Sequence, residues 1–200
     1  MVSTQRNATL PSGIAPFVLL YLVVCSALAW RQGNGEFVIY AGAMVVIIAT
    51  VLVVHGHARF SATVLWLLAI WGLLHMMGGT VLIDARWAET DSDRYVLYAM
   101  RLHPMLPRYD QMVHAFGFFA ATAACWEACR SLLRAKPGLA LSVTALLMGI
   151  GLGAINEVIE FGITLTVPEN GVGGYVNTGW DLVSNLIGAT AAAVWCLGRR

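Results

Sequence analysis

The stretch FVIYAGAMVVIIATVLVV, residues 37–54, is 18 residues long and contains no charged side chain. A helix needs about 20 mostly apolar residues to cross the roughly 30 Å hydrocarbon core of a membrane. Five further stretches approach that length, and the six expected helices cover residues 14–30, 37–54, 61–83, 109–130, 139–165 and 180–198. The sequence therefore predicts an all-α membrane protein, a bundle of six transmembrane helices that forms one domain over residues 1–200.

The overall composition agrees with this class. Hydrophobic residues make up 58% of the chain and charged residues only 12%, whereas soluble domains contain about 25% charged residues. The net charge is +1 and the chain has no run of basic residues, which argues against a nucleic-acid partner. The four cysteines lie within or at the ends of apolar stretches, where thiols behave as small hydrophobic groups, so no disulfide framework is expected.

The distribution of Lys and Arg favours cytoplasmic termini, because basic residues concentrate in cytoplasmic connections. Seven of the twelve basic residues fall on the side that would hold both termini, and five fall on the other side. The one long connection, residues 84–108, lies on that other, outer side. We expect Tyr95 to Leu102 to form a short helix in the interface. The connection either covers the bundle or acts as a lid over a site beneath it.

Polar residues recur near the outer ends of four of the apolar stretches. They are His75, Asp110, His114, Glu157, Glu160, Asp181 and Asn185. Because consecutive helices run in opposite directions, late positions in the third and fifth helices share a layer with early positions in the fourth and sixth. Asp110 and His114 are four residues apart, as are Asp181 and Asn185, and Glu157 and Glu160 are three apart. The two residues of each pair therefore lie on one face of their helix. Ionisable groups at membrane depth are costly and usually mark a functional site, so we expect a polar site in the outer half of the bundle.

Four carboxylates in one dry cluster cannot all stay charged without compensation. A bound metal ion, proton exchange in a transporter, or a structural network that fixes helix packing would each provide it. Carboxylate and imidazole groups from facing helices are a suitable ligand set for zinc, manganese, magnesium or iron. The candidate metal ligands are His75, Asp110, His114, Glu160 and Asp181.

The sharpest functional hypothesis is a metal-assisted hydrolase that acts on a membrane lipid or a lipid-linked substrate. Glu157, Glu160 and Asp110 are the candidate catalytic residues, with one glutamate as the general base for a metal-bound water. Arg101, Arg108 and Asn185 are the candidate substrate-binding residues. The alternatives are a proton- or ion-coupled transporter of a small solute and a non-catalytic accessory protein of the cell envelope.

The polar signatures also have the order and spacing of a known family. The segments are HMMGG (75–79), YDQMVH (109–114), EVIEF (157–161) and WDLVSNLIG (180–188). Over roughly residues 72–190 they resemble the YjdF-like (DUF2238) inner-membrane proteins of bacteria and, more distantly, the VanZ-like proteins. The resemblance implies a bacterial inner-membrane protein with a polar outer-side site, and the VanZ-like similarity points to the cell envelope or its lipids.

Two residues depart from these patterns. Gln111 stands where the VanZ-like proteins have a basic residue after the aspartate, which removes one counter-charge. Asn185 stands where the YjdF-like proteins tend to have a second acid.

Overall fold

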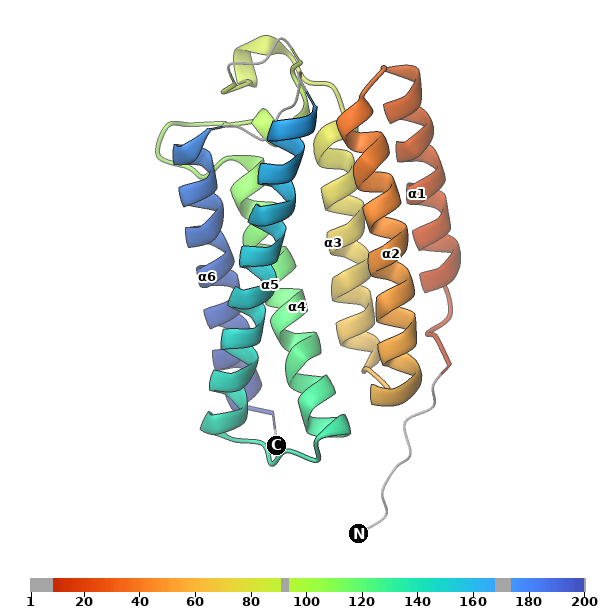
Figure 1. The fold of residues 1–200 in the computed structure, drawn as a ribbon, viewed down its shortest axis with the longest axis vertical. Helices are drawn as coiled ribbons and strands as arrows, with labels where there is room; N and C mark the ends of the chain where they lie inside the picture. Colours follow the sequence, from red (N-terminus) through yellow and green to blue (C-terminus); the bar gives the residue numbers. More distant parts are fainter. Residues whose placement is uncertain (1–8, 91–93, 168–173, 200) are drawn as a thin grey trace.

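The computed structural model describes residues 9–90, 94–167 and 174–199, and its regular structure is helical (Figure 1). The six long helices are α1 (Ile14–Arg31), α2 (Gly35–Ala58), α3 (Ala62–Thr80), α4 (Tyr109–Leu132), α5 (Leu139–Thr166) and α6 (Tyr175–Leu197). Each is long and apolar enough to cross a membrane. The predicted bundle of six transmembrane helices is therefore confirmed, and the chain is a multi-pass membrane protein.

The bundle consists of two groups of three helices. Figure 1 shows α1, α2 and α3 on one side and α4, α5 and α6 on the other. Within the second group α4 packs most extensively against α6, and α5 contacts both. Helix α4 also packs against α3 and joins the two groups.

Small residues allow α4, α5 and α6 to approach one another closely, as is common between helices in membranes. Gly188 on α6 lies against the backbone carbonyl of Ala115 on α4. Gly149 on α5 lies against the side chain of Thr122 on α4. A side chain at either glycine would overlap these atoms, so the glycines determine how near the polar ends of the three helices lie.

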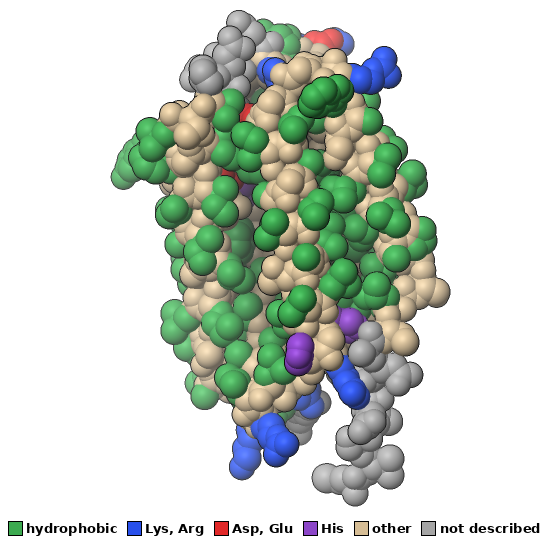
Figure 2. All heavy atoms as spheres, turned by 45° about the vertical axis from the view of Figure 1, so that its right-hand side comes forward, with side chains coloured by type: hydrophobic (Ala, Val, Ile, Leu, Met, Phe, Trp, Pro, Cys, Tyr) green, Lys and Arg blue, Asp and Glu red, His purple; other side chains and the backbone are tan. Residues whose placement is uncertain are grey.

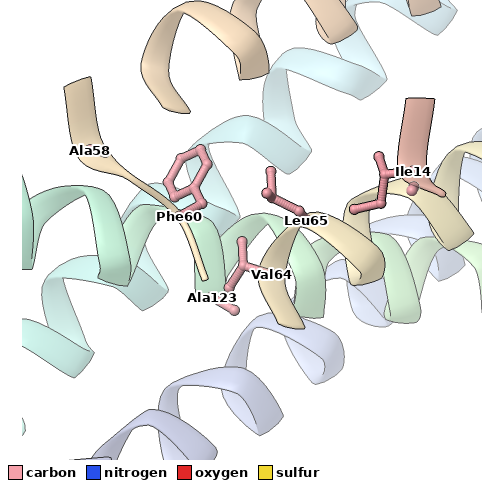
Figure 3. Packing of buried hydrophobic residues seen from close by; sticks show 7 residues of the cluster. Ile14, Ala58, Phe60, Val64, Leu65 and Ala123 are labelled. Atoms are coloured by element: carbon pink, nitrogen blue, oxygen red, sulfur yellow. The ribbon is translucent and has the colours of Figure 1, made fainter. Parts of the chain in front are cut away.

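At the opposite end of the bundle a buried carboxylate joins α3 to α4. The two oxygens of Glu127 accept hydrogen bonds of 2.6 Å each from the backbone N–H and the hydroxyl of Ser61, just before α3 begins. Arg199 lies 3.6 Å from the same carboxylate. At this end a buried apolar cluster packs α1, α3 and α4 together (Figure 3); its residues are Ile14, Ala58, Phe60, Val64, Leu65, Ala69 and Ala123.

The face of the bundle drawn in Figure 2 is mostly apolar along its length and carries basic side chains at both ends. Large apolar side chains such as Val46 on α2 and Val158 on α5 are exposed. Exposed aliphatic side chains of this kind are compatible with membrane lipid rather than with water.

The connection between α3 and α4 folds into a cap over the outer end. It contains two short 3-10 turns, Ala85–Trp87 and Leu97–Ala99. Two isolated antiparallel bridges, Leu82 with Val96 and Ala88 with Met100, hold its two arms together. Helix α3 ends at Thr80 rather than at the predicted Ile83. The residues after Thr80 are extended, and Leu82 pairs with Val96 in the part of the cap that leads to α4. The short helix expected from Tyr95 to Leu102 is only the single 3-10 turn.

Candidate metal centre

A buried cluster of His, Asp and Glu side chains lies at the outer ends of α4, α5 and α6. Asp110 and His114 come from the first two turns of α4, Glu157 and Glu160 from the end of α5, and Asp181 from the beginning of α6. Asp181 is fully buried, and His114 and Glu157 are 7% and 8% exposed. Each side chain in this cluster is therefore largely removed from solvent.

The imidazole of His114 lies at the centre of the cluster. Its Nε2 atom is 3.5 Å from Asp110 Oδ1 and 3.7 Å from Glu160 Oε1. Both distances are longer than the 2.7–3.2 Å of a typical N–H···O hydrogen bond. Two atoms that bind one ion at about 2.1 Å lie roughly 3 to 4 Å apart, so these separations suit shared coordination of a metal.

Asn185 fixes which nitrogen of His114 faces this space. Its amide nitrogen donates to Glu157 Oε1 at 3.2 Å, which directs the amide oxygen toward His114 Nδ1 at 3.0 Å. An amide oxygen only accepts, so Nδ1 carries the hydrogen, and in the neutral imidazole Nε2 then has the lone pair. A hydrogen bond from the non-ligating nitrogen is how proteins orient a metal-binding histidine.

The ligand atoms form two triads that share His114. The first triad is Asp110, His114 and Asp181, and the second is His114, Glu157 and Glu160; within each triad one atom per residue lies within 4.8 Å of the others. Each triad contains a buried carboxylate oxygen that has no hydrogen-bond partner among the residues that the structure describes, Asp181 Oδ1 in the first and Glu157 Oε2 in the second. A buried acceptor without a partner costs about 1–3 kcal/mol, more if charged, which a cation would offset.

Two asparagines that the sequence analysis did not single out also contact the carboxylates. Asn177 donates to Asp181 Oδ2 at 2.6 Å and to Asp110 Oδ2 at 3.4 Å. Asn156 donates to Glu160 Oε1 at 2.8 Å. Each precedes its acid by four residues, a spacing that could have indicated them. Asn177 was missed because α6 begins at Tyr175 rather than at the predicted Trp180.

The two candidate arginines of the outer connection lie in different surroundings. The Arg108 guanidinium is 3.3 Å from Asp110 Oδ2 and also donates to the backbone carbonyl of Glu89. Arg101 instead pairs with the Glu89 carboxylate at 3.0 Å. Arg108 is therefore adjacent to the cluster, whereas Arg101 stabilises the cap.

His75 belongs to neither triad and lies among aromatic rings. Its ring centroid is 5.3 to 5.9 Å from those of Phe37, Tyr40, Trp71 and Tyr98. The Tyr98 hydroxyl, from the cap, is 2.5 Å from His75 Nδ1. Burial, together with the negative charge of Asp110, raises the pKa of the Tyr98 phenol well above its usual value, so the hydroxyl stays protonated and donates to His75. His75 thus anchors the cap to α3.

Helix α2 borders the cluster on the side of His75. The Tyr40 hydroxyl interacts electrostatically with Glu160 and with Glu36, a buried acid in the first turn of α2. Neither residue was among the sequence candidates. Tyr40 lies inside an apolar stretch, where a tyrosine is no signal of a site.

Comparison with known proteins gives one family. No curated protein and no solved structure matches the chain. The family described as "Predicted membrane protein (DUF2238)" matches residues 14–200, which include all six helices and the whole buried cluster. The chain belongs to the DUF2238 family of membrane proteins.

Proposed function

We propose that this protein is a metal-dependent hydrolase of the membrane, with a divalent cation bound at His114, Asp110 and Asp181. The observation that supports this most directly is the arrangement around His114. Its Nδ1 is held by Asn185, while its Nε2 lone pair lies 3.5 Å and 3.7 Å from two carboxylates. Zinc, manganese and iron all accept mixed imidazole and carboxylate ligands of this kind, and magnesium accepts the carboxylates.

The reaction follows from the groups beside the ion. A divalent cation lowers the pKa of a bound water, and Glu160, 3.7 Å from His114 Nε2, accepts its proton. A hydroxide formed in this way would attack the ester carbon or phosphorus, and Glu160 would return the proton to the departing oxygen as its bond breaks. Arg108, next to Asp110, is placed to bind an anionic group of the substrate.

A lipid or lipid-linked substrate fits the position of the site. Figure 2 shows acidic side chains and a histidine recessed between helices, in the upper part of the otherwise apolar surface. A group carried by a lipid would approach through this side of the bundle. Beyond the cluster, toward the other end, Thr122 and Ala189 are fully buried beside Gly149. This close packing favours an enzyme open to lipid over a carrier with a path through the bundle.

The cellular setting is part of the same proposal. DUF2238 membership and the YjdF-like and VanZ-like spacing of the polar signatures support a bacterial inner-membrane protein. The distribution of basic residues supports cytoplasmic termini. The metal centre then faces the outer leaflet, where envelope lipids are processed.

Elemental analysis of the protein purified in detergent tests the proposal. We expect a stoichiometric transition metal or magnesium in the wild type and loss of the ion of the first triad in Asp110→Asn, because that change removes a ligand charge. Glu160→Gln should retain a metal at the first triad and lose hydrolysis of lipid esters. Glu89→Gln, an acid in the cap, is the control and should behave as wild type. The proposal fails if the wild type binds no metal, or if Asp110→Asn retains all of it.

A further inference from the structure

The two triads raise the question of how many cations the cluster holds. Asp181 and Glu157 belong to different triads, and His114 is the residue that the two triads share. One ion bound to His114 Nε2 is close to Asp110 and Asp181, while Glu157 lies 3.7 Å from the other ring nitrogen, Nδ1. The ligand atoms thus form two distinct triads, although Glu160 of the second triad lies 3.7 Å from Nε2, the nitrogen that also faces Asp110 of the first.

The hydrogen bonds of the cluster leave the second point available for an ion. Asn185 Nδ2 donates to Glu157 Oε1, and Glu157 Oε2 has no hydrogen-bond partner within residues 9–90, 94–167 and 174–199, although Glu157 is only 8% exposed. Glu160 lies one helical turn further along α5, and its Oε1 is 3.7 Å from His114 Nε2, while Glu157 Oε1 is 3.7 Å from Nδ1. Two carboxylates on one helix face, one of them with a buried oxygen that lacks a partner, suit a hard divalent cation completed by water.

The charges of the cluster are compatible with a second ion. The triads contain four carboxylates, and Arg108 is the cation paired with them, by a 3.3 Å contact to Asp110. With the acids ionised, Arg108 and one divalent ion leave one negative charge in excess, whereas Arg108 and two divalent ions leave one positive charge in excess, so the charges accommodate either number of ions. Excess buried charge at membrane depth costs several kcal/mol.

We propose, building on the metal-dependent hydrolase above, that the site binds two divalent cations, one in each triad, and that the pair acts on a phosphate ester of a lipid. The first ion is bound by Asp110, His114 and Asp181, and the second by Glu157 and Glu160. Paired ions stabilise both the attacking and the leaving oxygen in phosphate-ester hydrolysis. Glu160 binds the second ion through one oxygen and keeps the other to accept the proton of the attacking water. Hydroxide would then form the new P–O bond as the bond to the lipid oxygen breaks, and Glu160 would return its proton to that oxygen.

The number of bound Mn²⁺ ions tests this inference separately from the proposed function. The purified protein is stripped with a chelator, equilibrated with Mn²⁺ and assayed for manganese per chain. We expect two ions in the wild type and in the control Glu89→Gln. Asp181→Asn and Glu157→Gln, each nearly identical in shape to the native residue, should bind one ion each. The double variant should bind none.

Each outcome of this experiment has a separate meaning. One ion in the wild type contradicts the second position and leaves the proposed metal-dependent hydrolase intact, whereas no ion contradicts both. Two ions in Glu157→Gln also contradict the inference. The wild-type count decides the matter even if a variant does not fold, which far-UV circular dichroism would reveal. Calorimetric titration with inorganic phosphate should show binding to the two-ion form and at least tenfold weaker binding to Glu157→Gln, and equal binding to both forms would rule out the phosphate-ester substrate.

Discussion

His114 connects the two triads, and its role depends on a neutral neighbour. Asn185 is 2% exposed and holds both His114 Nδ1 and Glu157. Gly153 on α5 makes room for it, since a Cβ at that position would lie 3.1 Å from the Asn185 amide nitrogen. The Asn185 amide contacts His114 through its oxygen and Glu157 through its nitrogen. It therefore orients both side chains without adding a charge to the cluster.

Replacing Asn185 by Leu should therefore weaken metal binding about 10- to 100-fold, the usual effect of removing a partner that orients a metal-binding histidine. Asn185→Asp keeps an acceptor for His114 Nδ1 and should bind metal more tightly than Asn185→Leu. Competition with a metal-sensitive dye would measure both affinities. Equal affinity of wild type and Asn185→Leu would show that the Asn185 contact does not orient His114.

The raised pKa of Tyr98 predicts that the folded protein loses stability at alkaline pH. Its phenol keeps a raised pKa in the folded protein, whereas in the unfolded chain it ionises near the usual value of about 10. The folded state therefore binds more protons above pH 10, and the stability that Tyr98 contributes is present below that pH and is lost as the pH rises. The difference in unfolding free energy between wild type and Tyr98→Phe, about 1 kcal/mol at neutral pH from the His75 hydrogen bond, should shrink above pH 10. A difference that stays constant from pH 8 to 11 would refute this.

At the scale of helices, the contact between α4 and α6 sets the geometry of the first triad. Asp110 and His114 lie on α4 and Asp181 on α6, and Gly188 lies against the Ala115 backbone directly between these helices. Gly188, which is not one of the candidate metal ligands, thus determines how far apart α4 and α6 lie. A change in that separation would alter all distances between the two sides of the triad.

Gly188→Ala should lower the unfolding free energy by about 1–3 kcal/mol, because the added methyl group forces the helices apart. It should also weaken metal binding, since Asp181 moves away from His114. Gly151→Ala, where an added Cβ meets no atom within 4 Å, is the matched control and should leave both properties unchanged. Thermal unfolding in detergent and metal titration would measure the two effects. Equal stability of the two variants would mean that the α4–α6 contact can adjust without cost.

At the scale of the whole molecule, the orientation in the membrane decides which leaflet the cluster faces. The four native cysteines are free and buried, so the protein has little background reactivity toward polar thiol reagents. Arg86 in the cap and Lys136 in the connection between α4 and α5 are exposed at opposite ends. Single cysteines at these two positions would report on the two sides of the membrane.

A membrane-impermeant maleimide applied to intact bacterial cells should label Arg86→Cys. It should label Lys136→Cys only after the cells are permeabilised. This is expected because seven of the twelve basic residues lie on the Lys136 side. The reverse labelling pattern would place the metal centre at the cytoplasmic leaflet and would exclude substrates of the outer leaflet.

The sequence by itself determined the class of the fold and the identity of most polar residues in the cluster. Apolar stretches of membrane length reveal themselves through composition alone, since lipid tolerates few charged side chains along a helix. The alternation of helix directions likewise predicted that residues from the fourth, fifth and sixth helices would share one layer. The predicted helix ends were less accurate. Helix α6, for example, begins at Tyr175 rather than at Trp180, because its first turn lies in a polar segment.

Only the tertiary structure decided which of these residues interact. Whether a side chain in the shared layer reaches its neighbours depends on helix rotation and on close contacts such as that of Gly188, which no local pattern encodes. His75 has the depth expected of a ligand, yet its helix turns it toward aromatic rings and Tyr98. Asn177 and Asn156 contact the carboxylates because packing places them there. The division of the acids between two triads arises in the same way, because it depends on which carboxylate oxygens the packing of α4, α5 and α6 brings within reach of one another.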